Sequence, residues 1–198
     1  MPPMNNLSVR RTRTILGYLG LLVLMVLSAC AGQPTSHKMN EVTALATAIK
    51  ALGPEVDPLE ADRAARIAFV HSGELALQYQ ITDPPLIHNT KVNMGLRPRG
   101  LCWHWAEDME TRLTQEEFET LDLHRAIANS KNPFRIEHST TIISRKGDTM
   151  FDGIVLDPWR KGGQLTWIGT RADTDYKWLP QRQVLISKQE RKRRRARN

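Results

Sequence analysis

The stretch IEHSTTIISRKGDTMFDGIVLDP, residues 136–158, decides the fold of this chain. Residues 136–145 are rich in β-branched side chains, as is typical of a strand. Lys146-Gly147-Asp148 has the composition of a turn. Residues 149–156 then return as the partner strand and end at Asp157-Pro158. The stretch therefore predicts an antiparallel hairpin.

Helices are expected on the N-terminal side of the hairpin. Asp57-Pro58 has the form of an N-cap followed by proline at the first helical position, and apolar residues recur at helical spacing to about Tyr79. The pattern as a whole predicts an α+β fold, with N-terminal helices packed on an antiparallel sheet. The other expected elements are helices at 41–52 and 101–113, a short helix from 114, a loop at 91–100, and strands at 120–128 and 164–169.

The first thirty residues have the pattern of an export signal. Three arginines precede an apolar run from Ile15 to Leu27, and Leu27-Ser28-Ala29-Cys30 closes that run. This tetrapeptide resembles the lipobox of bacterial lipoproteins. The resemblance implies that residues 1–29 are cleaved, that the Cys30 thiol carries a diacylglycerol, and that the new amino terminus is acylated, which anchors the protein stably. The alternatives are an ordinary cleaved signal peptide and a short anchor helix.

The anchor places the protein in the cell envelope, facing the periplasm. Ala31 stands where the enterobacterial sorting pattern has an aspartate to retain lipoproteins in the inner membrane, which favours the outer membrane. Residues 30–56 are then expected to be the lipidated N-terminus and a tether, and residues 57–187 to form one globular domain.

The net charge of +7 comes from the two ends of the chain. Arginines of the signal and the basic residues after 187 supply it, so the part between them is mildly acidic and does not have the surface of a nucleic-acid-binding domain. Residues 188–198 are expected to be a solvated, disordered tail. The alternative is an electrostatic contact with anionic lipid headgroups or cell-wall polymers.

Lipidation of Cys30 leaves Cys102 without a partner in the chain, since there are two cysteines. Cys102 is expected at a helix start, where the partial positive charge of the helix favours a thiolate. His138 and Asp157 are expected on the two strands of the hairpin, within reach of each other. A histidine can draw the proton from a thiol while an aspartate fixes its tautomer. The alternative is an inert, buried cysteine.

The segment from Arg99 to Trp167 resembles the transglutaminase-like branch of the papain-like cysteine hydrolases. The Gly-Leu-Cys-Trp helix start at 100–103, the strand with His138, and the hairpin ending in Val-Leu-Asp-Pro-Trp at 155–159 carry the resemblance. It implies Cys102 as nucleophile, His138 as general base and Asp157 as the residue that orients it. The implied reaction is acyl transfer or hydrolysis at an amide bond of a protein or peptide, through a thioester.

The chain departs from that family after the histidine, where Ser139-Thr140 replace the frequent aromatic residue. Asn93 is the candidate side-chain donor for the oxyanion, beside the backbone amide of Cys102. Trp103 and Trp159 are candidates for a substrate groove, with core packing as the alternative.

The other histidines are not expected to take part in the reaction. On a helix His104 would point away from Cys102, so it is a poor base for that thiol. The remaining histidines show no ligand spacing, and neither a metal nor a cofactor is expected. A non-catalytic envelope lipoprotein that uses the same fold for binding or assembly is the alternative function.

Overall fold

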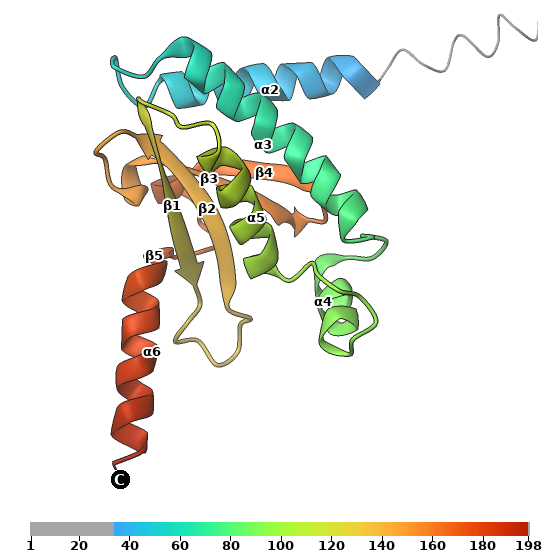
Figure 1. Cartoon of the computed structure of the whole chain (residues 1–198), viewed down its shortest axis with the longest axis vertical. Coiled ribbons are helices and arrows are strands. Elements are labelled where there is room, and N and C mark those ends of the chain that lie inside the picture. The colour runs from blue at the N-terminus through green and yellow to red at the C-terminus, as the bar shows by residue number, and fades with distance from the viewer. Residues whose placement is uncertain (1–33, 198) are drawn as a thin grey trace, which may run out of the picture. The chain divides into compact units, whose positions relative to one another are not determined.

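The computed structural model describes residues 34–197. Within them, four helices precede the strands of a sheet, and one helix follows. Cys30 and the export signal lie outside the described residues. The fold is α+β, as predicted (Figure 1). The elements, in chain order, are α2 (Pro34–Lys50), α3 (Pro58–Gln78), α4 (Pro85–Asn93), α5 (Cys102–Thr114), β1 (Leu121–Ala128), β2 (His138–Arg145), the 3-10 turn η1 (Met150–Asp152), β3 (Ile154–Lys161), β4 (Gln164–Gly169), the 3-10 turn η2 (Thr170–Ala172), β5 (Leu179–Pro180) and α6 (Gln181–Arg195).

The sheet is antiparallel, with strand order β4-β3-β2-β1-β5. The predicted hairpin is its centre: Thr141 pairs with Leu156 and Ile143 with Ile154. β3 begins later than the sequence predicts, because residues 150–152 form a 3-10 turn instead of extended chain. β3 also ends later than predicted, at Lys161, so Asp157 lies inside β3 and not at its end.

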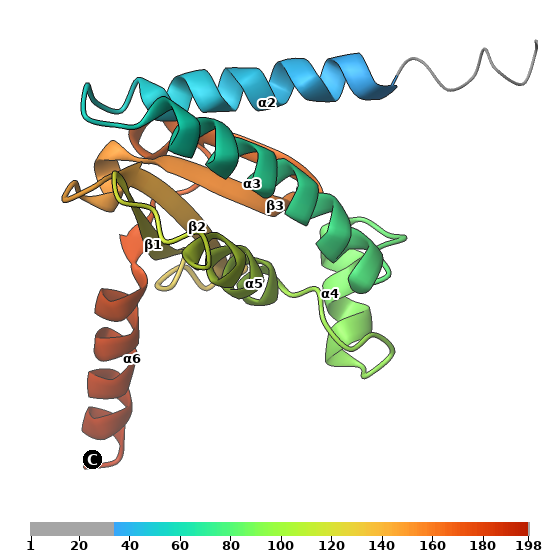
Figure 2. The same cartoon turned by 45° about the horizontal axis from the view of Figure 1, so that its top comes forward.

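α3 and α5 cover one face of the sheet (Figures 1 and 2). The predicted N-cap of α3 is confirmed, since Asp57 accepts hydrogen bonds from the amides of Leu59 and Glu60. Small side chains such as Ala64 and Ala68 let α3 approach closely, and Met109 of α5 is fully buried in the same cluster. A second, smaller cluster, with Ile142, Val155 and Trp178 among its members, lies on the other face of the sheet.

The domain begins before residue 57, the boundary that the sequence predicts. Residues from Val42 onward belong to one compact unit, and the residues before it belong to another. Leu45 and Ile49 of α2 are fully buried in the main hydrophobic cluster of the second unit. Burying these two apolar side chains stabilises the unit, so this end of α2 is part of the domain.

Two helices are absent from the sequence-based prediction. Pro84-Pro85 begins α4 where the sequence predicts only the end of a helix, because proline fits the first helical position. Most of residues 188–198, the segment predicted as a disordered tail, belongs to α6, which runs from Gln181 to Arg195. Arginine, lysine and glutamine are good helix formers, and the side chain of Val184 anchors the first turn of α6.

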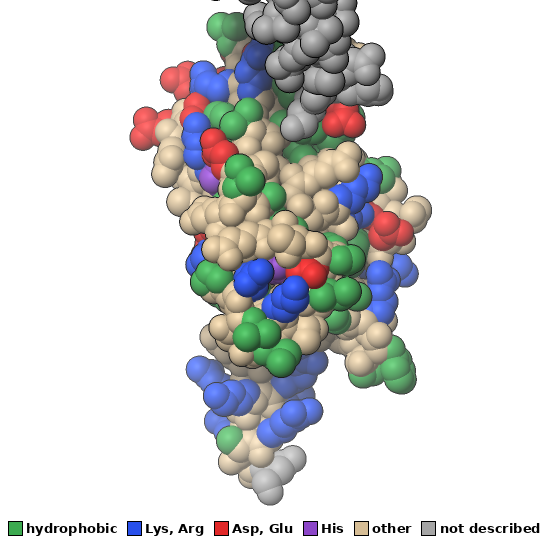
Figure 3. Space-filling model, turned by 90° about the vertical axis from the view of Figure 1, so that its right-hand side faces the viewer, with side chains coloured by type: hydrophobic (Ala, Val, Ile, Leu, Met, Phe, Trp, Pro, Cys, Tyr) green, Lys and Arg blue, Asp and Glu red, His purple; other side chains and the backbone are tan. Residues whose placement is uncertain are grey.

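Basic side chains gather at the lower end of the view in Figure 3, where α6 lies. Seven lysines and arginines follow one another closely there: Lys188, Arg191, Lys192, Arg193, Arg194, Arg195 and Arg197. Within residues 34–197, no helix is long and apolar enough to cross a membrane.

Candidate functional site

The loop before α5 is held by two side chains of that helix, and Cys102 is the first helical residue. Nδ1 of His104 accepts hydrogen bonds from the amides of Gly100 and Leu101, each 3.1 Å long. The indole nitrogen of Trp105 donates to the carbonyl oxygen of Gly100 at 3.0 Å. These contacts tie the loop to its own helix, so the position of the cysteine is fixed locally.

Gly100 adopts a φ of +122°, which glycine tolerates and other residues rarely do. An added Cβ would also overlap the ring of His88, whose Nε2 donates to the carbonyl oxygen of Arg99 at 2.9 Å. His104 acts as the prediction requires, away from the thiol. Burial first, and then the charge of Arg99, lower the pKa of His104, which keeps the ring neutral and able to accept hydrogen bonds.

His138 and Asp157 meet across the central strands. Nε2 of His138 donates to Oδ2 of Asp157 at 2.6 Å, and each side chain is only 1% exposed. By strand alternation both residues share the sheet face of Ile142 and Val155, opposite the face that carries α5. A short charge-assisted bond in such a dry site holds the ring in one orientation.

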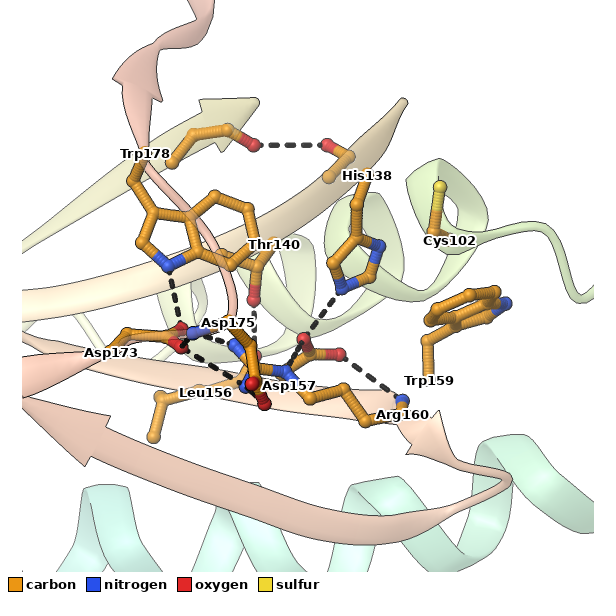
Figure 4. A network of polar contacts seen from close by, with 12 residues as sticks. Cys102, His138, Thr140, Leu156, Asp157, Trp159, Arg160, Asp173, Asp175 and Trp178 are labelled. Carbon is orange, nitrogen blue, oxygen red and sulfur yellow. Dashed lines mark hydrogen bonds and ion pairs between the residues drawn. The ribbon is translucent and has the colours of Figure 1, made fainter. Parts of the chain in front are cut away.

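The side chain of Cys102 lies beside the N-terminal end of β2, where His138 is the first residue. Its sulfur donates to the carbonyl oxygen of Glu137 at 3.6 Å, one residue before that strand begins. Nδ1 of His138 is buried and has no hydrogen-bond partner among the described residues. Figure 4 shows the imidazole between the Asp157 carboxylate and the Cys102 side chain. The free ring nitrogen therefore lies on the side of the thiol.

The charges around His138 raise its pKa. Burial alone would lower the pKa, but the Asp157 carboxylate and, to a smaller extent, Cys102 outweigh it, and the pKa of His138 rises to about 9. At neutral pH the site therefore favours an imidazolium. Such a cation stabilises an adjacent thiolate.

The sequence did not point to Arg160, which holds the far side of Asp157. Its Nε donates to the same Oδ2 that His138 contacts, at 2.6 Å. The two terminal nitrogens pair with Asp173, and Asp175 lies 3.6 Å away. Trp178 adds a hydrogen bond to Asp173 at 2.8 Å. Figure 4 shows this network on the side of the imidazole away from Cys102, where it fixes the position of the Asp157 carboxylate.

Three aromatic side chains surround the His138 ring. The centroids of Trp159 and Tyr176 lie 4.6 Å from it, and that of Trp178 lies 5.4 Å away. Trp159 packs in one cluster with Cys102 and lines the groove beside His138, whereas Trp103 is 46% exposed and does not line that groove. The other two aromatics come from the segment after β4, which carried no sequence signal for a site.

The two asparagines of α4 differ in position. Asn93, the candidate oxyanion donor, is exposed at the C-terminal end of the helix. Asn89 is 8% exposed, and its Oδ1 accepts from the indole nitrogen of Trp159 at 3.1 Å. This bond leaves the amide nitrogen of Asn89 as the end that can donate.

Ser139 and Thr140, which stand in place of the frequent aromatic residue, use their hydroxyls within the sheet. Ser139 donates to the carbonyl oxygen of Ala126 at 3.3 Å and Thr140 to that of Leu156 at 3.0 Å. Both bonds join β2 to a neighbouring strand. The polar pair therefore holds the strand that carries His138.

Within the part of the chain that the structure describes, no group of three or more His, Cys, Asp or Glu side chains is placed to hold a metal ion. The chain matches no family model, no curated protein and no solved structure. Its function is therefore argued from the site itself.

Proposed function

We propose that this protein is a cysteine hydrolase or acyltransferase that acts on amide bonds through a thioester, with a transglutaminase-like or papain-like core. The observation that carries the proposal is the buried His138, bonded to Asp157 through Nε2 and with Nδ1 free on the side of Cys102. A nucleophile, a base and a group that orients the base are the parts that covalent catalysis needs.

In the proposed reaction, the proton of the Cys102 thiol has passed to Nδ1 of His138, and the thiolate of this ion pair attacks the carbonyl carbon of the substrate. His138 then returns the proton to the leaving amine as the C–N bond breaks, and the acyl group remains on sulfur. Water or a second amine, deprotonated by the same nitrogen, cleaves the thioester and frees the thiol. The sulfur first leaves its bond to the carbonyl oxygen of Glu137.

The oxyanion of the tetrahedral intermediate needs donors near the sulfur. The first hydrogen bonds of α5 are donated by His104 and Trp105, both to the carbonyl oxygen of Leu101, so the amides of Cys102 and Trp103 precede them at the helix start. Among side chains, Asn89 is the donor that the geometry favours, because it is buried against Trp159.

The test is the alkylation rate of Cys102. Mature protein is treated with iodoacetamide at pH 7, and the peptide that contains Cys102 is quantified by mass spectrometry. His138→Ala should slow the reaction about a hundredfold, as expected for loss of a general base. His71→Ala, in α3 and bonded to Glu74, is the matched control and should react like the wild type. Equal rates in His138→Ala and the wild type would falsify the proposal.

The second candidate is a non-catalytic binding or assembly module. It is favoured by one observation: the thiol is 7% exposed and donates to a backbone carbonyl in the structure. A slow thiol that is indifferent to His138→Ala is its expected signature.

We also propose that the domain is a lipoprotein of the cell envelope, anchored through Cys30 and facing the periplasm. The support is the lipobox-like sequence alone. Cys30→Ser should abolish labelling by radioactive palmitate. Labelling that persists in this variant would place the lipid on another residue.

A further inference from the structure

A groove of about 690 Å³ opens directly beside His138. One wall is the start of α4, with Leu86 and Ile87, and the other is the β1–β2 loop, with Phe134 and Ile136. These four side chains are 54%, 51%, 95% and 55% exposed. Exposed apolar side chains that line a hollow next to a reactive group are typical of a ligand site, and the volume is in the range of such sites.

The charges in this groove are all of one sign. Its lining holds two arginines and neither Asp nor Glu. Arg160 is already paired with Asp157 and Asp173, so its charge is compensated. Arg135 lies over the Tyr176 ring at 5.2 Å and has no ion pair among the described residues. It is therefore the cation in the groove that remains available to a ligand.

The basic character continues on the far side of the β1–β2 loop. Arg135 also lines a second hollow, of about 550 Å³, together with Lys131 and Lys177. One carboxylate, Asp175, is present there, and it lies 3.6 Å from Arg160. A ligand that extends from the apolar groove across Arg135 thus meets three cationic side chains.

We propose that this groove binds an extended peptide that has an apolar side chain beside the reacting carbonyl and a carboxylate further along, over Arg135. The cleavage or transfer of that peptide rests on the proposed function, whereas its binding rests on the groove alone. A peptide is favoured over a membrane surface because the apolar side chains line a hollow that leads to His138.

Binding is measured first with full-length mature Cys102→Ser protein and fluorescent hexapeptides, by anisotropy. The reference peptide carries one leucine and one glutamate three residues apart; in two others serine replaces the leucine or lysine replaces the glutamate. The reference peptide should bind at least about tenfold more tightly than either.

Four substitutions locate the site. Phe134→Ser should remove the preference for leucine, and Arg135→Gln the preference for glutamate. Leu77→Ser changes another highly exposed apolar residue, on α3, and Arg171→Gln changes an arginine that also lies over an aromatic ring; both should bind like the parent. Absence of any preference among the peptides, or equal losses in the control variants, overturns the proposal.

Wild-type protein and a p-nitrophenyl ester of the reference peptide separate the two proposals. Selective binding without a burst of p-nitrophenol or an acyl-enzyme mass means that the groove is right and the proposed reaction is wrong. A burst that is equally fast for all three peptide esters means that the proposed reaction is right and the proposed groove is wrong. Binding to phosphatidylglycerol vesicles that is lost in Phe134→Ser, without peptide selectivity, assigns the surface to a membrane and overturns the peptide proposal.

Discussion

Replacement of Asp157 by asparagine tests the electrostatics of the site most directly. The side chains have nearly the same shape, and asparagine can still accept a hydrogen bond from His138 or Arg160. What is lost is the negative charge that raises the pKa of His138 to about 9. Burial, the largest influence on that pKa, acts in the opposite direction and remains. The smaller raising effect of Cys102 also remains, so the pKa of His138 in Asp157→Asn should fall from about 9 towards its usual value of 6.5.

The size of the effect follows from the two pKa values. A rise from 6.5 to about 9 corresponds to about 3 kcal/mol of stabilisation of the folded protein. Because the folded pKa exceeds the unfolded one, this contribution is complete below pH 6.5 and disappears as the pH rises through 9. The difference in free energy of unfolding between wild type and variant should therefore shrink by about this amount between pH 6 and pH 10, in the window that this pKa shift sets.

Urea unfolding at several pH values measures that difference, and NMR of the histidine ring protons gives the pKa itself. Asp175→Asn is the matched control: Asp175 also lies near Arg160, at 3.6 Å, but it is 73% exposed and does not contact His138. The control should leave the pKa of His138 unchanged. A His138 ring that still titrates near 9 in Asp157→Asn, or a stability difference that does not vary with pH, would refute the reasoning.

Other predictions concern the scaffold and the oxyanion. Gly100→Ala should lower the melting temperature strongly, because its Cβ overlaps the α4 histidine, whereas Gly95→Ala, also at positive φ but in open space, should cost only about 1 kcal/mol. Glu60→Gln should lower the free energy of unfolding by about 2 kcal/mol at pH 7, since its carboxylate accepts two backbone amides at 2.7 and 2.9 Å. Burial raises the pKa of Glu60, but the hydrogen bond from the Thr120 hydroxyl and these two amide bonds lower it overall, so the loss should shrink as the pH falls below 4.5; a constant loss contradicts this. Asn89→Ala should slow the p-nitrophenol burst about a hundredfold without changing alkylation by iodoacetamide, and Asn93→Ala should change neither; the opposite pattern would restore Asn93 as the donor.

Local patterns in the sequence were sufficient to predict the elements whose first residues or composition are distinctive. Asp57-Pro58 starts α3 by a side-chain cap and a proline, and both act within one turn. The β-branched run before Lys146 forms β2, because its residues pack well in a strand, here one that is buried on both faces. The helical spacing of His104 and Cys102 predicted that His104 forms its hydrogen bonds elsewhere than at the thiol, and its Nδ1 accepts two backbone amides.

Patterns failed where one signal fits two structures. Pro84-Pro85 fits either the end of one helix or the start of the next; α3 already ends at Gln78, and the two prolines start α4, which the sequence did not predict. The basic run after residue 187 is typical of a solvated tail whose charges repel one another. In the structure it continues α6, whose first turn is held by the buried side chain of Val184. Lys188 pairs there with Glu137 at 2.6 Å, a contact between residues far apart in the chain that no local pattern contains.

The sequence by itself determined the α+β order, the helix start that presents Cys102, and the hairpin that carries His138 and Asp157. The tertiary structure alone decided what surrounds them: Asn89 against Trp159, Arg160 between two carboxylates, and the apolar groove beside the imidazole. The reason is physical. Caps, turns and periodicity act between residues a few positions apart, whereas burial and charge depend on every side chain that the fold brings near, whatever its distance along the chain.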